Sequence, residues 1–318
     1  MIPVIIDTDP GHDDALAIML AVKSGLFDIK AITTVAGNST IENTTRNARY
    51  VLKLLGKENI PIYSGASKPL KHGLVQAVVH GKSGLEGIDP NNESLLTNNA
   101  AEKIISIVKS NPSITIITIG PLTNIAQAIL QDPETMKKVK QIITMGGAIR
   151  VPGNKNRVAE FNIFVDPDAA DIVFNFPVKK TIVPLDACND VQLQLEDFEK
   201  LKGTSLYEPV IKMMKPYIKN IGENEGVFAA LMYDPLTVYY LLNPTAYSLK
   251  EYDIKIETKG KLTRGMTVAE ERNIPKNYNV NVVEKIDGES FKRDFIEILK
   301  KDSLSALSFK FSRKAGDK

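Results

Sequence analysis

Residues 4–25 read VIIDTDPGHDDALAIMLAVKSG and join a short apolar run to an apolar helical segment through a cluster of acids. The run at residues 4–6 is β-branched, which is typical of a buried strand. Residues 13–23 predict a helix that is apolar nearly all round and therefore buried. Lys23 and Gly25 provide the signal that ends it. A buried strand followed by a buried helix is the beginning of a βαβ unit.

The same alternation of strand and helix continues along the chain. Further strands are predicted at residues 29–35, 114–119, 139–145 and 181–185, and further helices at residues 41–55, 100–109, 122–130 and 168–174. Strands that alternate with helices form a parallel sheet. Residues 193–242 look helical, and residues 255–283 predict strands again. We therefore predict one α/β domain, residues 1–309, with a mostly parallel open sheet flanked by helices and an elaborated helical second half, followed by a basic tail, residues 310–318.

The composition of the chain argues against several classes of protein. The chain has 318 residues, and 40 Lys and Arg against 38 Asp and Glu leave a formal net charge of +2. A charge this small gives no electrostatic reason to expect a nucleic acid partner. The apolar runs are shorter than the roughly 18 to 20 residues of a membrane span. The start lacks the basic region of a secretory signal, and the one cysteine, Cys188, cannot form an internal disulfide, so we expect a cytoplasmic protein.

The acids of the opening segment, Asp7, Asp9, Asp13 and Asp14, are expected at the carboxyl end of a buried strand. Open α/β sheets bind their ligands at that edge. Like charges in a low-dielectric cleft repel one another and raise one another's pKa. A divalent cation resolves this conflict, and oxygen ligands alone favour a hard ion, with Ca²⁺ a better match than Mg²⁺ for clustered carboxylates. The alternative, a solvated helix start, fits poorly beside so apolar a strand and helix.

Residues 7–15 resemble the DxDPGxDDA signature of the calcium-dependent nucleoside hydrolases, the inosine-uridine preferring nucleoside hydrolase family. The resemblance continues through VAGN at 35–38, HGKSGL at 80–85, GPLTN at 120–124, MGG at 145–147, EFN at 160–162, DP at 234–235 and GKLTRGMTV at 260–268. It implies an enzyme of nucleoside salvage that hydrolyses the N-glycosidic bond of ribonucleosides to ribose and free base, with Ca²⁺ as cofactor. Members of the family are usually dimers or tetramers, so a homo-oligomer is implied as well.

The resemblance also implies a metal site and a general base. The Ca²⁺ ligands would be the side chains of Asp9, Asp14 and Asp234 and the main-chain carbonyl of Ile119. Asp9 would accept a proton from a calcium-bound water as that water attacks the anomeric carbon. Asp234 could instead be a helix N-cap, and Ile119 is in any case expected to be a buried strand residue.

Further matched positions would hold the substrate. They are Asp13, Asn38, Asn154, Glu160, Phe161, Asn162 and Asp234. Polar partners for the sugar hydroxyls would select ribose over deoxyribose, because a missing hydroxyl leaves buried polar groups unpaired. The asparagines could also be turn residues, whereas Glu160, Phe161 and Asn162 suit the edge of a sugar-binding strand. Asp166, Pro167 and Asp168 predict only the start of the next helix.

Activation of the leaving base is the point at which the sequence departs from the family. The inosine-uridine group has histidine before the last metal-binding aspartate, and a purine-specific group has tryptophan, whereas this chain has Tyr233. Tyr233 could donate a proton, stack on the base or form the pocket wall. His80, the other candidate catalytic residue, matches a position near the base or sugar, with an exposed loop histidine as the alternative. Tyr239, Tyr240 and residues 220–226 could shape a pocket for a modified base.

Two other functions are compatible with the acidic cluster. One is a calcium-dependent nucleoside or sugar sensor that binds without turnover. The other is an aspartate-based phosphohydrolase like the haloacid dehalogenases, although those enzymes carry DxDxT/V where this chain continues from Asp9 with Pro10 and Gly11. Release of reducing sugar would favour the hydrolase over both.

Overall fold

The computed structural model describes residues 1–90 and 96–301, and the predicted basic tail, residues 310–318, lies outside the described residues. The elements of the first half are, in chain order, β1 (Ile2–Thr8), α1 (His12–Ser24), β2 (Phe27–Thr34), α2 (Ile41–Leu54), β3 (Ile62–Ser64), α3 (Ala100–Ser110), β4 (Thr115–Thr118), α4 (Thr123–Gln131), α5 (Pro133–Met136), β5 (Gln141–Met145), α6 (Phe161–Val165), α7 (Pro167–Asn175) and β6 (Lys180–Val183). Every strand and helix predicted in this half is present. The short strand β3 was not predicted, because it has no apolar run.

The second half is mostly helical before it returns to strands. Its elements are α8 (Leu185–Cys188), β7 (Gln192–Leu193), α9 (Leu195–Glu199), α10 (Tyr207–Glu225), β8 (Ala230–Leu231), α11 (Tyr233–Leu242), the 3-10 helix η1 (Pro244–Ala246), β9 (Tyr247–Tyr252), β10 (Ile254–Ile256), β11 (Thr267–Ala269), β12 (Val280–Ile286) and α12 (Gly288–Lys300). The helical region and the later strands agree with the prediction. The edge strand β9 was not predicted, because its middle residues are exposed.

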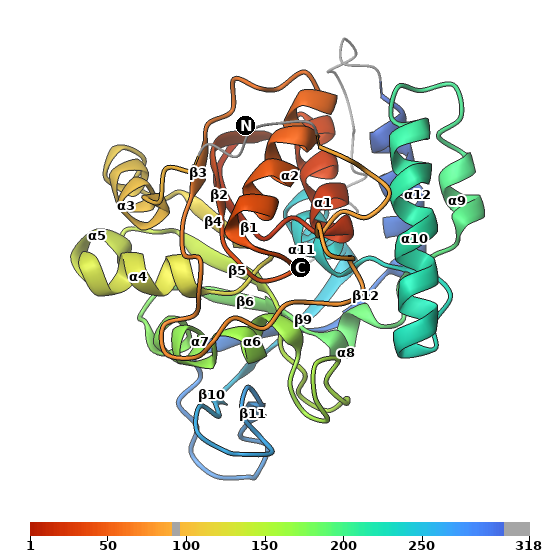
Figure 1. The fold of residues 1–318 in the computed structure, drawn as a ribbon. Coiled ribbons are helices and arrows are strands. Elements are labelled where there is room, and N and C mark those ends of the chain that lie inside the picture. Colours follow the sequence, from red (N-terminus) through yellow and green to blue (C-terminus); the bar gives the residue numbers. More distant parts are fainter. Residues whose placement is uncertain (91–95, 302–318) are drawn as a thin grey trace, which may run out of the picture.

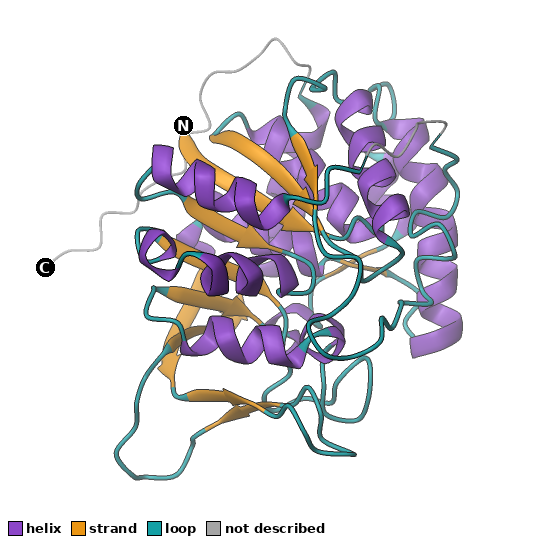
Figure 2. Cartoon of the chain, turned by 60° about the vertical axis from the view of Figure 1, so that its left-hand side comes forward, coloured by secondary structure: helices purple, strands orange, loops and turns teal. Residues whose placement is uncertain are grey.

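The central sheet has 8 strands in the order β3-β2-β1-β4-β5-β6-β12-β9, and helices cover both of its faces (Figure 1 and Figure 2). Neighbouring strands are parallel, except that β12 and β9 at one edge are antiparallel. The predicted fold class, a single α/β domain with a mostly parallel sheet flanked by helices, is therefore confirmed.

The core lies on both faces of this sheet, and β1 contributes to each. Val4 and Ile6 belong to the apolar cluster that includes α1, whereas Ile5 belongs to the cluster on the other face, which includes α3 and α4. Residues 15–21 of α1 are at most 1% exposed, since α11 and α12 pack against this helix. The predicted burial of α1 is thus confirmed.

The carboxyl ends of the parallel strands bring distant segments together. The register pairs Asp7 at the end of β1 with Thr33 of β2 and with Thr118 of β4. The segments that leave these strands, including residues 9–14 and 119–124, therefore start side by side at one edge of the sheet. This is the edge at which open α/β sheets bind ligands.

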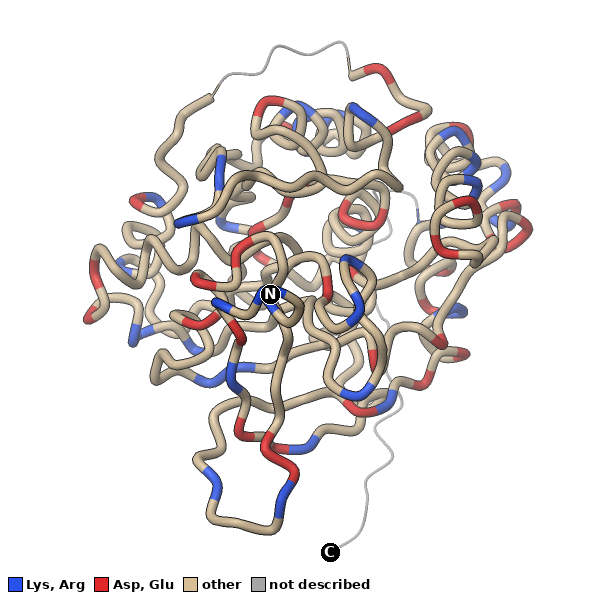
Figure 3. The backbone as a smooth tube through the Cα atoms, turned by 60° about the horizontal axis from the view of Figure 1, so that its bottom comes forward, with Lys and Arg blue, Asp and Glu red and all other residues tan. Residues whose placement is uncertain are grey.

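The surface carries both signs of charge and one projecting ribbon. Figure 3 shows Lys and Arg interspersed with Asp and Glu along the described chain. The antiparallel pair β10 and β11 extends away from the main body (Figure 2), and Leu262 (82%), Ile274 (45%) and Tyr278 (57%) are exposed in its loops. Within residues 1–90 and 96–301, no helix has the combination of length and apolar character that crossing a membrane requires.

Candidate active site

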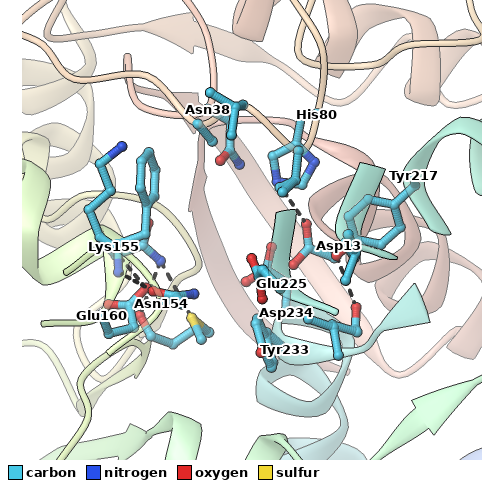
Figure 4. A pocket seen from close by; sticks show the side chains of 18 of the residues that line it. Asp13, Asn38, His80, Asn154, Lys155, Glu160, Tyr217, Glu225, Tyr233 and Asp234 are labelled. Carbon is cyan, nitrogen blue, oxygen red and sulfur yellow. Dashed lines mark hydrogen bonds and ion pairs between the residues drawn. The ribbon is translucent and has the colours of Figure 1, made fainter. Parts of the chain in front are cut away.

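A cavity lies at the carboxyl edge of the sheet, and it gathers most of the residues predicted to act (Figure 4). Its lining includes Asp13, Asn38, His80, Ile119, Asn154, Glu160, Phe161, Asn162, Tyr233 and Asp234. The remaining two predicted residues, Asp9 and Asp14, are fully buried and hydrogen-bonded to Asn38. The predicted positions, which are far apart in the sequence, are therefore neighbours in space.

Asp14 is held in place by four donors. Its Oδ1 accepts hydrogen bonds from Thr8 Oγ1 at 2.5 Å and from the backbone N–H of Asp9 at 3.2 Å. Its Oδ2 accepts from the backbone N–H of Gly11 at 2.9 Å and from Asn38 Nδ2 at 3.0 Å. Burial raises the pKa of Asp14, and these donors oppose that rise. The orientation of this carboxylate is thus set by the turn between β1 and α1.

Asp9 has one satisfied oxygen and one free oxygen. Its Oδ2 accepts the backbone N–H of Asn38 at 2.6 Å, whereas Oδ1 is buried without a hydrogen-bond partner among the described residues. A Cβ on Gly37 would lie 2.2 Å from Oδ2, and one on Gly120 would lie 2.6 Å from Oδ1. Both positions therefore require glycine, because any side chain would displace the carboxylate. Burial, followed by the charge of Asp14, raises the pKa of Asp9 well above its ordinary value.

Three carboxylates are close enough to share a cation. Within the described residues, one oxygen each of Asp13, Asp14 and Asp234 lies within 4.8 Å of the others, and all three side chains are buried. Burial, followed by the charges of neighbouring aspartates, raises the pKa of Asp13 and Asp234 well above the usual range. Asp13 Oδ1, like Asp9 Oδ1, has no hydrogen-bond partner among residues 1–90 and 96–301. Buried carboxylates that repel one another, two of them with an oxygen that accepts no hydrogen bond within the described residues, suit a hard divalent ion.

Asp7, the remaining acid of the opening segment, is separate from this cluster. Its Oδ1 accepts hydrogen bonds from Thr33 Oγ1 and, at 2.8 Å, from Asn124 Nδ2. Asn124 also donates to the carbonyl of Thr34 at 3.0 Å and accepts from the backbone of Ala66 at 2.9 Å. Asp7 and Asn124 therefore tie β1, β2 and α4 together beneath the cavity.

Glu160 differs from its predicted setting. Instead of lying on a strand edge, it is the N-cap of α6: Oε1 accepts the backbone N–H of Asn162 at 2.8 Å, and Oε2 accepts that of Ile163 at 3.1 Å. Oε2 also accepts the N–H of Gly147 at 3.0 Å. The predicted strand edge is wrong because the carboxylate satisfies the free N–H groups of a helix start. The side chain still lines the cavity.

The amides beside Glu160 have local partners as well. Asn154 Oδ1 accepts the backbone N–H of Phe161 at 2.9 Å, which positions this loop against α6. Asn162 Nδ2 reaches the carbonyl of Ile119 at 3.4 Å, a long contact that leaves this oxygen weakly engaged. Asp166 caps α7 through the N–H of Ala169 at 3.1 Å, so its predicted role as a helix start is confirmed.

His80 belongs to a stack of three rings. Its ring centroid lies 5.3 Å from that of His12 and 5.3 Å from that of Tyr217, with interplanar angles of 24° and 16°. His12 Nδ1 lies 3.0 Å from His80 Nδ1, and His12 Nε2 lies 3.0 Å from the carbonyl of Glu86. Burial lowers the pKa of His12 to about 4 and that of His80 well below its usual value. His80 is 5% exposed, so it is not an exposed loop histidine.

Tyr233 begins α11 and places its ring in the cavity beside Asp234. Its hydroxyl donates to Asn189 Oδ1 at 3.0 Å. The neighbouring helix α10 contributes Tyr217, Ile221 and Glu225 to the lining. No motif in the sequence marks these three residues, although they lie within or near the segment expected to shape the pocket.

Tyr239 and Tyr240 do not line this cavity, contrary to the expectation from the sequence. The Tyr239 hydroxyl donates to Asp294 Oδ2 at 2.6 Å, and its ring packs edge-on against Phe291. Tyr240 packs edge-on against Tyr247. Both tyrosines lie more than one turn beyond Tyr233 along α11, and their rings contact residues of α12 and β9 instead of the cavity.

The sequence profile described as "Inosine-uridine preferring nucleoside hydrolase" matches residues 4–293. The chain belongs to this family. The resemblance seen in the sequence is therefore confirmed, and the protein is a ribonucleoside hydrolase, an enzyme that cleaves the N-glycosidic bond of ribonucleosides. Its buried carboxylate cluster is a site that could hold a metal ion.

Relatives cover nearly the whole length of the hydrolase. The pyrimidine-specific ribonucleoside hydrolase RihA of Citrobacter koseri is 39% identical over 300 residues, which span 91% of this chain and 95% of that protein. Among solved structures, a plant nucleoside hydrolase, the PpNRh1 enzyme, superposes with a TM-score of 0.88 at 32% identity, covering 94% of this chain and 99% of the other. A purine-preferring ribonucleoside hydrolase from Gardnerella vaginalis gives 0.86 at 28% identity, covering 94% and 98%.

The buried acids predict how the stability of the metal-free hydrolase depends on pH. Burial raises the pKa of Asp7 to about 7 and that of Asp13 and Asp234 well above the usual range. A raised folded-state pKa contributes stability at low pH that is lost as pH rises through it. The buried histidines act in the opposite direction below about pH 6.5. We therefore expect the free energy of unfolding to fall between about pH 6.5 and 8.5, by about 1 kcal/mol from Asp7 alone, whose pKa of about 7 lies inside this range. The carboxyls of Asp13 and Asp234, whose pKa values are raised further, add to the fall as they lose their protons.

Urea denaturation with a chelator present measures this fall. Adding Ca²⁺ should restore the stability, and more at the higher pH, because a metal binds the deprotonated carboxylates. A metal-free protein that gains stability over this range, or that Ca²⁺ leaves unchanged at both ends, would contradict the prediction.

Proposed function

We propose that this ribonucleoside hydrolase uses Ca²⁺ held by the side chains of Asp9, Asp14 and Asp234 and by the carbonyl of Ile119. The observation that carries the proposal is the buried Oδ1 of Asp9, which has no hydrogen-bond partner within the described residues and lies beside a cluster of carboxylates. When bound, the ion supplies Lewis acidity that lowers the pKa of a water molecule and offsets the repulsion of the acids. The carbonyl of Ile119, engaged only by a long contact of 3.4 Å, is free to serve as a ligand.

Asp9 is the general base in this proposal. Its Oδ2 is held by Asn38 at 2.6 Å, which fixes the orientation of the carboxylate and leaves Oδ1 to take a proton from the attacking water. Because Oδ1 accepts no hydrogen bond within the described residues, it can take up a proton without breaking an existing contact. As the glycosidic bond breaks, the ribose becomes oxocarbenium-like, and the surrounding carboxylates stabilise the positive charge.

The ribose contacts come from residues on both sides of the cavity. They are Asp13, Asn38, Asn154, Glu160, Phe161, Asn162 and Asp234, all of which line it. Several of them are braced by backbone hydrogen bonds, so their positions are set before substrate binds. Because these groups pair with hydroxyls in a buried setting, ribose is favoured over deoxyribose.

Tyr233 acts on the leaving base, and His80 acts where the base meets the sugar. Both rings line the cavity, and His80 Nε2 lies 3.8 Å from Asp13 Oδ1, next to the ribose end. The Tyr233 hydroxyl donates a hydrogen bond to Asn189 in the free enzyme. In the proposed reaction it gives its proton to the base nitrogen as the glycosidic bond breaks. The identity to pyrimidine-specific RihA enzymes, 39% for the Citrobacter koseri protein, supports a pyrimidine ribonucleoside as the substrate.

A reducing-sugar assay over a panel of ribonucleosides tests this proposal. We expect ribose release from uridine and cytidine, its loss in the presence of a chelator and its return with Ca²⁺. Asp9→Asn should lower kcat by about 10²- to 10⁴-fold, the usual contribution of a general base. Asp28→Asn, at a surface ion pair with Lys30, is the matched control and should leave activity unchanged. Activity in protein shown to be metal-free would contradict the role of the ion.

Tyr233→Phe tests the activation of the base. If its hydroxyl protonates the leaving group, the variant should hydrolyse uridine about tenfold more slowly or worse. It should lose much less on p-nitrophenyl riboside, whose leaving group needs no proton. Tyr240→Phe makes the same change on the same helix away from the cavity, and serves as the control. Equal slowing of both substrates by Tyr233→Phe would exclude a proton-donor role.

We also propose that the enzyme serves nucleoside salvage in the cytoplasm as a dimer or tetramer. The buried thiol of Cys188 supports a reducing compartment, since no second cysteine exists to pair with it. Exposed Leu262, Ile274 and Tyr278 near β10 and β11 offer apolar surface for a second copy. Light scattering of the purified protein measures its mass in solution, and a monomer at micromolar concentration would contradict the oligomer.

A further inference from the structure

Glu225 is an acid in the cavity to which the proposed mechanism gives no task. It is the last residue of α10, and Gly226 follows in the left-handed conformation that ends the helix. Its side chain lines the cavity and is labelled there in Figure 4. Within the described residues, the Glu225 side chain makes no hydrogen bond and no ion pair. A glutamate at a helix C-terminus also faces the negative end of the helix dipole, so its place is unfavourable for the fold.

Glu225 ends a stripe of side chains along α10. Tyr217, Ile221 and Glu225 are spaced four residues apart, so they share one face of the helix, and all three line the cavity. Tyr217 is 2% exposed and Ile221 is 1% exposed, whereas Glu225 is exposed to solvent. The stripe therefore runs from the interior of the cavity to its mouth. The Tyr217 hydroxyl donates its proton to the carbonyl of Leu231 at 3.2 Å, and Ile221 has no polar side-chain atom. On this face of α10, the Glu225 carboxylate is therefore the group that can accept a hydrogen bond from a ligand.

Glu225 and Tyr233 line the same cavity as Asp13. Tyr233 is the residue proposed to act on the leaving base, and Asp13 is one of the residues proposed to hold the ribose. A ribose held at Asp13 therefore leaves its base in the part of the cavity that Tyr233 and the α10 residues Ile221 and Glu225 line.

We propose that Glu225 is a specificity-determining residue that accepts a hydrogen bond from an N–H group on the leaving base. This inference rests on the proposed function, because it names the substrates of the same site. A carboxylate is an acceptor only, so it favours a base edge that presents a donor. Uracil presents its ring N3–H and cytosine its 4-amino group. Pyrimidine ribonucleosides that carry such a donor are therefore the preferred substrates, and those without one are disfavoured.

Uridine and 3-methyluridine provide the test, because the methyl group removes the N3–H donor and keeps both carbonyls and the glycosidic bond. The holoenzyme with Ca²⁺ should show kcat/KM about tenfold or more higher for uridine, the effect of one hydrogen bond to a charged group. Glu225→Met keeps the length of the side chain but removes the acceptor, and should shrink this preference to less than about threefold. In Glu225→Met, kcat/KM should fall more for uridine than for p-nitrophenyl riboside, because the leaving group of the riboside has no N–H donor. Glu225→Gln, a neutral acceptor, should be intermediate.

Glu223→Met is the matched control. Glu223 lies on the same helix and pairs with Lys219 at 3.7 Å on the exposed side, so this variant should keep the full preference for uridine. An unchanged preference in Glu225→Met would overturn the inference, and so would an equal loss on uridine and p-nitrophenyl riboside, or a wild-type enzyme that does not distinguish uridine from 3-methyluridine. A wild-type protein that releases ribose from none of the three substrates would instead refute the proposed function, and the inference with it.

Discussion

Repulsion between buried carboxylates is the constraint around which this site is built. Asp9, Asp13, Asp14 and Asp234 are at most 6% exposed, and neighbouring charges raise the pKa of all but Asp14 in addition to burial. Such a group is costly to fold unless a cation or protons neutralise it. The surrounding structure fixes the positions of the acids, through hydrogen bonds that stabilise the carboxylate of Asp14 and through glycines that leave room for Asp9. The cluster therefore lowers the stability of the metal-free fold and forms a site that could hold a metal ion.

The same constraint explains the layout of the cavity. The acids come from the turn after β1 and from the first turns of α1 and α11, so the charged end of the cavity lies at the carboxyl edge of the sheet. Glu160 and Asn154 face them from the other side, anchored by backbone N–H groups (Figure 4). The helix α10 then covers the remaining wall with Tyr217, Ile221 and Glu225. In the proposed mechanism, the braced residues hold the sugar, and the wall that α10 provides lies at the base.

Much of this arrangement was predictable, and the errors have physical causes. The apolar runs and the helix after β1 were recognised because burial on both sides leaves a continuous apolar pattern. The short strand β3 and the exposed strand β9 lack that pattern and were missed. Glu160 was expected on a strand edge, but its carboxylate caps α6, and sequence alone cannot distinguish a capping acid from a ligand-binding acid when both precede an apolar run. Tyr239 was expected near the pocket, yet it packs against Phe291 in the core.

Local patterning was enough to specify the parallel sheet, the buried α1 and the crowded acids at the end of β1, since each of these depends on residues within about one βαβ unit. The family signature likewise extends along the chain and identified the hydrolase. The partnerless oxygen of Asp9, the stack of His80 on His12 and Tyr217, and the placement of Glu225 at the mouth were not readable in this way. Each of them depends on contacts between segments far apart in the chain, and such contacts exist only once the sheet edge and α10 have closed around a common cavity.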